Sequence, residues 1–419
     1  MKTVVVISTR GFGVFRHDLL VDPDGVRFVG IFSERDAVNV GPVERAYFHA
    51  IHVVPGGAIN ESNSESSVVD AEATRAVLRE IADDPGTGVL TVHSFDERNM
   101  LLTGRLREEF GLPGPTHDEL LPYRDKCLMK TKLAGTGLRV PRFAHFDPEA
   151  FRSDANAYFD RITADVGLPF VVKPVDAASA DGVYKVFARE EFLALPGELG
   201  RAYEYEEHID GTMYSVNLVS KDRTTVFGGV TEYLVNSTEV QRGRVNADIN
   251  LIDTDPRVPR MIRFTETVLD ALGWLDGACH LELFHTKDDE LVFLEVGARF
   301  KGLAGLAAMQ LNYAVALLNL AFEIEAGLES RPWDQEQVYC FDAVIPKRPG
   351  VVARLVEPDV TSEFEMKWKA VEGGEIQKGE SLVDNGGTFL VWNSDYDQLY
   401  RDFEKLAGYT PIHYQDEQI

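Results

Sequence analysis

Glu282 and Glu295 are the residues of this chain whose type and spacing point most directly to chemistry. They lie in two runs of alternating apolar residues, 279–285 and 291–297, on either side of a polar turn at 287–290. This pattern predicts a β-hairpin. With a symmetric turn Glu282 faces Glu295, and opposed carboxylates about 5 Å apart repel each other. A divalent cation between them would remove that repulsion. The apolar residues are expected on the other face: Leu281, Leu283, Val292, Leu294 and Val296.

Arg299 follows this predicted hairpin after two small residues. Two carboxylates with open coordination positions suit Mg²⁺ that is also bound by substrate phosphates. A guanidinium beside them can grip a carboxylate or a phosphoryl group with two hydrogen bonds. An exposed hairpin with solvated acids fits the same residues, so the rest of the chain must decide between the two interpretations.

A second pattern joins Lys173 to a loop of small residues. Lys173 closes an apolar strand at 169–174, the loop spans 177–182, and a return strand is expected at 183–188. Backbone N–H groups of such a loop can hold phosphates, with the lysine as a point charge beneath them. The spacing is not that of a Walker loop, and a plain hairpin is the alternative.

The composition restricts the classes of partner. Of 419 residues 44% are hydrophobic and 26% charged, which is typical of a globular protein with room for about three domains. The formal charge of −26 argues against nucleic acid or an anionic membrane as the main partner. Three scattered cysteines indicate a reducing, cytoplasmic location. The uncharged stretch 302–322 is expected to be a buried helix and not a membrane span.

The N-terminal part predicts a parallel, doubly wound domain, because strands and helices alternate there. Strands are expected at 2–7, 27–32 and 88–93, and helices at 68–82 and 98–110. Glu97 follows the last of these strands, where ligands of such sheets collect. A favourable charge at a helix N-terminus is the alternative explanation of Glu97.

Residues 241–250 are expected to be irregular and polar, with Arg242 and Arg244 as possible anion contacts. An amphipathic helix is expected at 256–272, directly before the glutamate hairpin. The C-terminal residues 335–419 predict a small α+β lobe, with a tight hairpin at 373–380 and no catalytic groups.

The order of these pieces resembles the ATP-grasp superfamily. The matching stretches are DKCLMK (125–130), PFVVKP (169–174), SADGV (179–183), EEHIDG (206–211), HLEL (280–283) and EVGARFKG (295–302). The last motif and the chain length are most similar to the branch of carboxylate–amine ligases that join amino acids. The resemblance implies an α/β and α+β multidomain fold. Its parts would be a Rossmann-like domain at 1–114, an ATP-grasp N-terminal subdomain at 115–204, a C-terminal subdomain with the metal site at 205–334, and a lobe at 335–419.

The resemblance also implies roles for individual residues. ATP would be bound by Lys126, Lys173, Ser179, Gly182, Val183, Glu206, Glu207 and Ile209. Mg²⁺, or Mn²⁺, would be bound by Glu282 and Glu295. Arg299 would stabilise the acyl phosphate or bind substrate together with Gly302 and Leu303, and Glu97 would hold a substrate ammonium group.

Two positions depart from the family pattern. Met213 stands where many relatives have a ribose-binding acid, which leaves Glu207 as a candidate for that contact. Gly297 replaces an asparagine that commonly helps to bind metal, so the number of metal ions stays open.

The activity that the resemblance implies is ATP-dependent joining of a carboxylate to an amine through an acyl phosphate, with amino acids as small-molecule substrates. A homodimer is expected by analogy with the family. Alternatives are a ligase that loads a carrier-protein thiol, a carboxylase-type subunit, and a nucleotide-binding regulatory protein that has lost catalysis. The identity of the acid and of the amine stays open.

Overall fold

The first sheet is parallel and four-stranded, with strand order β3-β2-β1-β4. The computed structural model describes residues 1–56, 68–178, 180–197, 199–302, 304–377 and 384–416. The strands are β1 (Lys2–Ile7), β2 (Val26–Ser33), β3 (Phe48–Val54) and β4 (Val89–His93). The doubly wound domain is thus confirmed. The sequence prediction missed β3, because this edge strand carries two histidines and is only partly buried.

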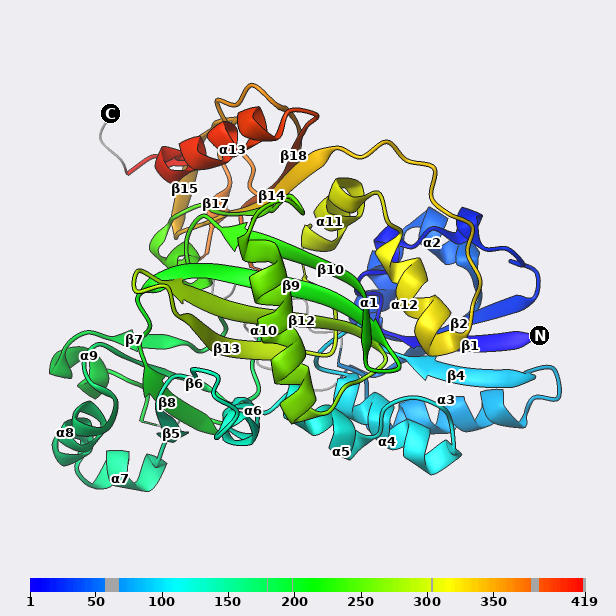
Figure 1. Cartoon of the computed structure of the whole chain (residues 1–419), viewed down its shortest axis with the longest axis horizontal. Coiled ribbons are helices and arrows are strands. Elements are labelled where there is room, and N and C mark those ends of the chain that lie inside the picture. Colours follow the sequence, from blue (N-terminus) through cyan, green and yellow to red (C-terminus); the bar gives the residue numbers. More distant parts are fainter. Residues whose placement is uncertain (57–67, 179, 198, 303, 378–383, 417–419) are drawn as a thin grey trace.

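Helices cover both faces of this sheet (Figure 1). α3 (Ala71–Asp83) and α4 (Met100–Phe110) pack on the face that carries Val5 and Ile31. The opposite face packs against α12 (Leu317–Ala326) from the distant part of the chain. Shorter helices are α1 (Glu34–Asn39), α2 (Pro42–Tyr47) and α5 (His117–Leu120).

The apolar stretch 302–322 forms two helices where one was expected. α11 (Gly305–Tyr313) ends at Ala314, whose φ of 50° breaks the helix, and α12 continues at an angle of 95°. Most of both helices is buried among core residues. In the described part of the chain no single helix has both the length and the apolar character needed to cross a membrane, although this bent pair meets those two criteria jointly.

The second sheet is small and antiparallel, with order β5-β8-β6-β7. Its strands are β5 (Phe143–His145), β6 (Phe170–Pro174), β7 (Tyr184–Val186) and β8 (Tyr203–Glu207). α7 (Pro148–Ser153), α8 (Ala155–Val166) and α9 (Arg189–Leu193) contribute to its aromatic core. The expected strand and return strand are therefore present as β6 and β7, and the loop predicted at 177–182 lies between them, with residue 179 outside the described residues.

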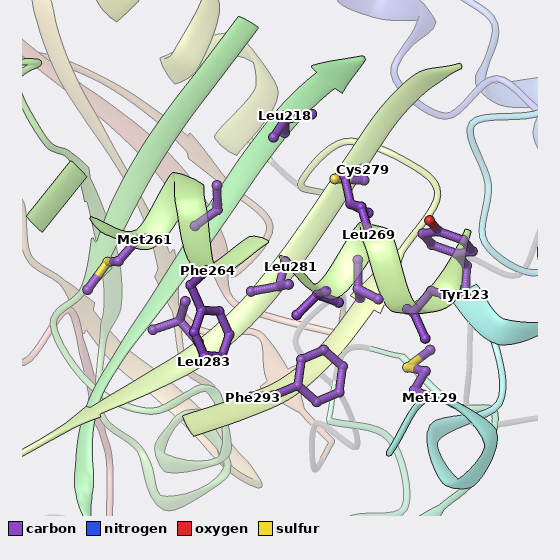
Figure 2. Close-up of a cluster of buried hydrophobic side chains, with 14 of the residues drawn as sticks. Tyr123, Met129, Leu218, Met261, Phe264, Leu269, Cys279, Leu281, Leu283 and Phe293 are labelled. Atoms are coloured by element: carbon purple, nitrogen blue, oxygen red, sulfur yellow. The ribbon is translucent and has the colours of Figure 1, made fainter. Parts of the chain in front are cut away.

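An eight-stranded sheet forms the centre of the molecule, with order β13-β12-β9-β10-β11-β14-β18-β16. The strands are β9 (Gly211–Lys221), β10 (Thr224–Tyr233), β11 (Asn246–Asn250), β12 (Gly277–Thr286), β13 (Leu291–Gly297), β14 (Tyr339–Ile345), β16 (Glu363–Trp368) and β18 (Gly387–Asn393). α10 (Arg257–Leu272) covers one face, where Met261, Phe264 and Leu269 pack on Leu281 and Leu283 (Figure 2). The opposite face carries polar side chains and borders the cleft described below.

The glutamate hairpin has the predicted register at its centre, since Glu282 pairs with Glu295. Beyond that pair a β-bulge shifts the register, and Leu283 pairs with Phe293. Because a bulge adds one residue to one strand, the predicted position of Leu294 in the core is wrong. Phe293 is fully buried there, and Leu294 lines the cleft beside Glu295.

Residues 246–250 were expected to be irregular, but the structure shows that they form the strand β11. Asn246, Asp248 and Asn250 alternate with Ala247 and Ile249, which lie in the core of the C-terminal part. The strand pairs with β10 and β14. Asn and Asp are depleted in strands, so a run in which every second residue is Asn or Asp resembles a loop in the sequence.

The C-terminal part extends the central sheet through β14, β18 and β16. It adds a three-stranded sheet of β15 (Gly350–Leu355), β17 (Glu375–Ile376) and β19 (Ile412–Tyr414), and the helix α13 (Tyr396–Lys405). The hairpin expected at 373–380 reaches beyond the described residues, which end at 377 in this region.

Candidate active site

One cleft collects most of the residues that the sequence pointed to. It has about 1290 Å³ of empty space and lies between the small sheet, the polar face of the central sheet and the loop after β13. Its walls include the following predicted residues: Lys126, Lys173, Val183, Glu206, Glu207, Ile209, Glu282, Glu295, Arg299 and Gly302. Ser179 and Leu303 lie outside the described residues.

The two glutamates of the hairpin have different partners. Glu282 accepts hydrogen bonds from the Tyr233 hydroxyl at 3.2 Å and from His280 Nε2 at 3.3 Å. Burial alone would raise the pKa of Glu282, but His280 and Arg299 outweigh it and lower the pKa. Burial raises the pKa of Glu295, and the opposing effect of the nearby Lys126 is smaller, so the pKa lies above its usual value. A cation between the two carboxylates would favour the charged form of both.

These carboxylates fit a metal that takes its remaining ligands from a substrate. Among the described residues no three His, Cys, Asp or Glu side chains form a group that could hold a metal ion by themselves. Mg²⁺ is commonly bound by one or two carboxylates together with substrate phosphates and water. Glu282 and Glu295 are therefore suited to a metal–phosphate complex and not to a closed protein site.

A buried network of lysines and glutamates forms the opposite wall. Lys173 on β6 lies across from Glu204 on β8, and its Nζ is 2.5 Å from Glu206 Oε1. Lys130 of α6 (Lys126–Leu133) contacts Glu204 at 2.7 Å and Glu206 at 2.6 Å. Burial would lower the pKa of Lys173, but Glu206 and Glu204 raise it. Lys173 is thus held charged beside the cleft.

Glu206 is tied into this network through its side chain. Each of its carboxylate oxygens contacts a lysine, and Lys130 and Lys173 outweigh burial to lower its pKa to about 2. Because both carboxylate oxygens are engaged, the predicted contact of Glu206 with adenine would have to use its backbone. Lys130 and Glu204 were not predicted, although their spacing to Lys126 and Glu206 places each pair on one face of its element.

Lys126 connects the two walls. Its Nζ lies 3.1 Å from Glu295 Oε2 and donates to the carbonyl oxygen of Ala177 at 2.6 Å. It therefore touches both the Glu295 carboxylate and the start of the small-residue loop. In that loop Gly182 has a φ of 68°, and a Cβ there would lie 2.6 Å from the Tyr203 hydroxyl. Glycine is thus required at position 182 by both conformation and space.

The predicted adenine and ribose region lies at the β8–β9 connection. Ile209 and Met213 line the cleft there with Glu207. Glu207 accepts from Arg139 at 2.7 Å and from the backbone N–H of Arg142 at 3.1 Å. The side chain expected to bind ribose is thus already engaged by protein groups.

Arg299 is held by Glu97 from the first domain. Its Nε and Nη2 lie 2.7 and 2.6 Å from Glu97 Oε2, and Arg124 contacts Glu97 Oε1 at 3.0 Å. Burial would raise the pKa of Glu97, but Arg299 and Arg124 outweigh it and hold the pKa below its usual range. Glu97 is therefore a charged carboxylate with both oxygens occupied, beside the cleft and not among its lining residues.

Arg10 is a lining residue that the sequence analysis missed. It follows β1, before Gly11 with its φ of 79°. Its guanidinium has no hydrogen bond or ion pair within the described parts of the chain, and burial and the charge of Arg299 lower its pKa. The rule that placed Glu97 at the carboxyl end of a parallel strand could have found Arg10 as well.

A polar cluster on the central sheet was also missed. Lys301 ion-pairs with Asp248 and, at 3.3 Å, with Asp342, and its backbone N–H donates to Asn217 at 2.9 Å. Tyr233 and Asn246 lie beside this cluster in the cleft wall. The alternation of Asn246 and Asp248 with apolar residues was the signal that could have placed them on the cleft face.

Comparison with known proteins agrees with this geometry. Residues 123–303 match the model of the ATP-grasp domain. The L-arginine-specific L-amino acid ligase of Bacillus subtilis is 23% identical over 316 residues, which cover 70% of each chain.

Two solved structures have a similar fold. The L-amino acid ligase of Bacillus licheniformis superposes with a TM-score of 0.69 at 17% identity and covers 99% of both chains. The biotin carboxylase domain of the Hydrogenobacter thermophilus 2-oxoglutarate carboxylase, in complex with MgADP, ADP and bicarbonate, gives 0.65 at 15% identity and covers 98% of this chain and 91% of that one. The ATP-grasp domain expected from the motifs is confirmed at residues 123–303, and the similarity to L-amino acid ligases supports an enzyme of the ligase class.

Proposed function

We propose that this enzyme joins two amino acids, or closely related small molecules, at the expense of ATP and through an acyl phosphate. The observation that carries the proposal is the meeting of three kinds of group in one cleft. The cleft is lined by the opposed carboxylates Glu282 and Glu295, the lysines Lys126 and Lys173, and the fixed Arg299. The similarity to an L-arginine-specific L-amino acid ligase supports amino acids as the substrate class.

The first step brings two anions together. A substrate carboxylate oxygen bonds to the γ-phosphorus of ATP, the bond to the β–γ bridging oxygen breaks, and ADP leaves. Lys126 and Lys173 would neutralise the phosphate charge and hold the groups in line, which is the main task in phosphoryl transfer. Mg²⁺ bound by Glu282 and Glu295 would supply charge neutralisation at the phosphate oxygens.

The second step forms the amide. The amine nitrogen bonds to the acyl carbon, the bond to the phosphate oxygen breaks, and phosphate and one proton leave. Arg299 would stabilise the negative charge that develops on the carbonyl oxygen. Its double contact with Glu97 fixes the guanidinium before substrate arrives, so little reorganisation is needed.

The small-residue loop 177–182 would shield the acyl phosphate from water. Gly182 and Val183 would contribute here as phosphate-loop residues, as predicted from the sequence. Ile209, Glu207 and Met213 would border the nucleotide base and ribose.

The test of this mechanism follows one oxygen atom. Amino acids labelled with ¹⁸O in the carboxylate should transfer one label to the released inorganic phosphate, with ADP as the second product. Release of AMP and pyrophosphate, or phosphate without label, would contradict an acyl phosphate. Two alternatives are loading of a carrier protein and activation of bicarbonate. In either case the purified enzyme would show no amino-acid-dependent phosphate release.

A further inference from the structure

Two acceptor groups of β11 lie buried in the cleft wall without partners. Asn246 and Asp248 are only 3% and 4% exposed, and both line the cleft. Within the described residues the Oδ1 atom of each has no hydrogen-bond partner. A buried acceptor without a partner costs about 1–3 kcal/mol. Such groups at a ligand site are commonly satisfied when the ligand binds.

The carboxylates around Lys301 outnumber the positively charged groups by one. Lys301 is shared by Asp248 and Asp342, so one ammonium serves two carboxylates. Glu282 adds a third negative charge, and assigning it to the metal still leaves one carboxylate uncompensated. Burial outweighs the charge of Lys301 and raises the pKa of Asp248 to about 7. A ligand with one positive charge would therefore bind favourably here.

The neighbouring groups favour an organic cation. Tyr233 pairs with Asp248 across β10 and β11, and Lys301 Nζ lies 5.1 Å from the centre of its ring. The Tyr233 ring and the Asp248 carboxylate already lie against the ammonium of Lys301, so this wall suits organic ammonium groups. A divalent cation would need more oxygen ligands, whereas an ammonium has three donors that two or three acceptors can satisfy.

We propose that Asn246 and Asp248 bind the ammonium group of an amino-acid substrate. The inference rests on the proposed function, because it names the part of the cleft that recognises the amino group of one of the two amino acids. Lys301 occupies one Asp248 oxygen, which leaves the other oxygen as the acceptor for the ligand. Arg10, whose guanidinium is free of described partners, lies in the same cleft as a counterpart for a carboxylate.

The test measures equilibrium binding by calorimetry in the presence of ADP and Mg²⁺. Each of the twenty amino acids is titrated into the wild-type enzyme, and those that bind are compared with their 2-hydroxy acid analogues, in which a hydroxyl replaces the ammonium. The variants are Asp248→Asn, Asn246→Leu and the matched control Asp342→Asn. Asp342 is the other carboxylate of Lys301 but does not line the cleft.

We expect Asp248→Asn to weaken binding of the amino acid by about 10- to 100-fold, the usual effect of losing a hydrogen bond to a charged group. Binding of the hydroxy acid should change much less, and Asn246→Leu should show the same selectivity. Asp342→Asn should weaken both ligands little. An equal loss for amino acid and hydroxy acid, an equal loss in the control, or no amino-acid binding at all would overturn the inference.

This experiment is separate from the test of the proposed function. The binding comparison needs no turnover, whereas the proposed function fails if labelled oxygen does not reach phosphate. An enzyme that transfers the label but shows no selective loss in Asp248→Asn retains the proposed function and contradicts the ammonium subsite.

Discussion

Glu97 and Arg299 lie 202 residues apart in the sequence and are joined by two contacts of 2.7 and 2.6 Å to one carboxylate oxygen. The pair links the first domain to the loop that leaves the glutamate hairpin. Because both partners are buried, the position of Arg299 in the cleft depends on a residue of another domain.

Glu97→Gln is expected to lower kcat about 10- to 100-fold while the KM for ATP changes little. The variant loses the charge that fixes Arg299, and a catalytic group shifted by about 1 Å commonly costs that much. Steady-state kinetics measure both constants, and Glu80→Gln on the exposed face of α3 serves as the control. The predicted role of Glu97 as the binder of a substrate ammonium would instead raise the KM for an amino acid at constant kcat.

Glu295→Gln is expected to lower ATP turnover at least about 100-fold, since an amide carries no charge for the metal and a lost electrostatic group costs that much. The apparent Mg²⁺ requirement should rise in parallel. Phosphate release at increasing Mg²⁺ measures both effects. Glu290→Gln in the exposed turn of the same hairpin is the matched control, and equal turnover in the two variants would contradict the metal assignment.

Lys173→Met is expected to weaken ADP binding by about 10- to 100-fold, because a charged hydrogen bond to phosphate is lost. Fluorescence or calorimetric titration measures the affinity. Lys173→Arg keeps the charge and should retain more of it, and Lys221→Met at the exposed end of β9 should bind as the wild type does. Unchanged affinity in Lys173→Met would remove this lysine from the phosphate site.

The Glu206 carboxylate predicts a pH dependence of stability. Its folded-state pKa of about 2 lies below the ordinary value of 4.5, so its contribution is fully present above about pH 4.5 and is lost as the pH falls toward 2. Glu206→Gln should therefore reduce the free energy of unfolding by about 3–5 kcal/mol at pH 7, the usual cost of breaking a buried ion pair. Urea unfolding at pH 7 and pH 3 measures the difference, which should shrink at the lower pH. A difference that is the same at both values would contradict the ion-pair network.

The sequence predicted those parts of the site that are set by local pattern. Strand alternation and turn position were sufficient to pair Glu282 with Glu295, and the apolar strand before Lys173 was sufficient to place that lysine at a loop. Strand period and turn residues are local properties, so they can be inferred from the sequence alone.

The missed features depend on tertiary context. The bulge beside Glu295 changes the side of the hairpin on which Leu294 lies. No residue type in the hairpin predicts the bulge. Strand β11 is polar on one side only because it borders a cleft, which moved Asn246 and Asp248 from an expected loop into the wall of the site. The contact of Glu97 with Arg299 becomes visible only when the first domain is packed against the central sheet, because the two residues lie 202 positions apart.

The measurement that tests the central claim most directly is phosphate release from ATP and Mg²⁺, with the purified enzyme offered all pairs of the twenty amino acids and the products analysed by mass spectrometry. The account predicts release that depends on amino acids, and a product whose mass equals two amino acids minus one water. Bound nucleotide without amino-acid-dependent release, or release without such a product, would contradict it.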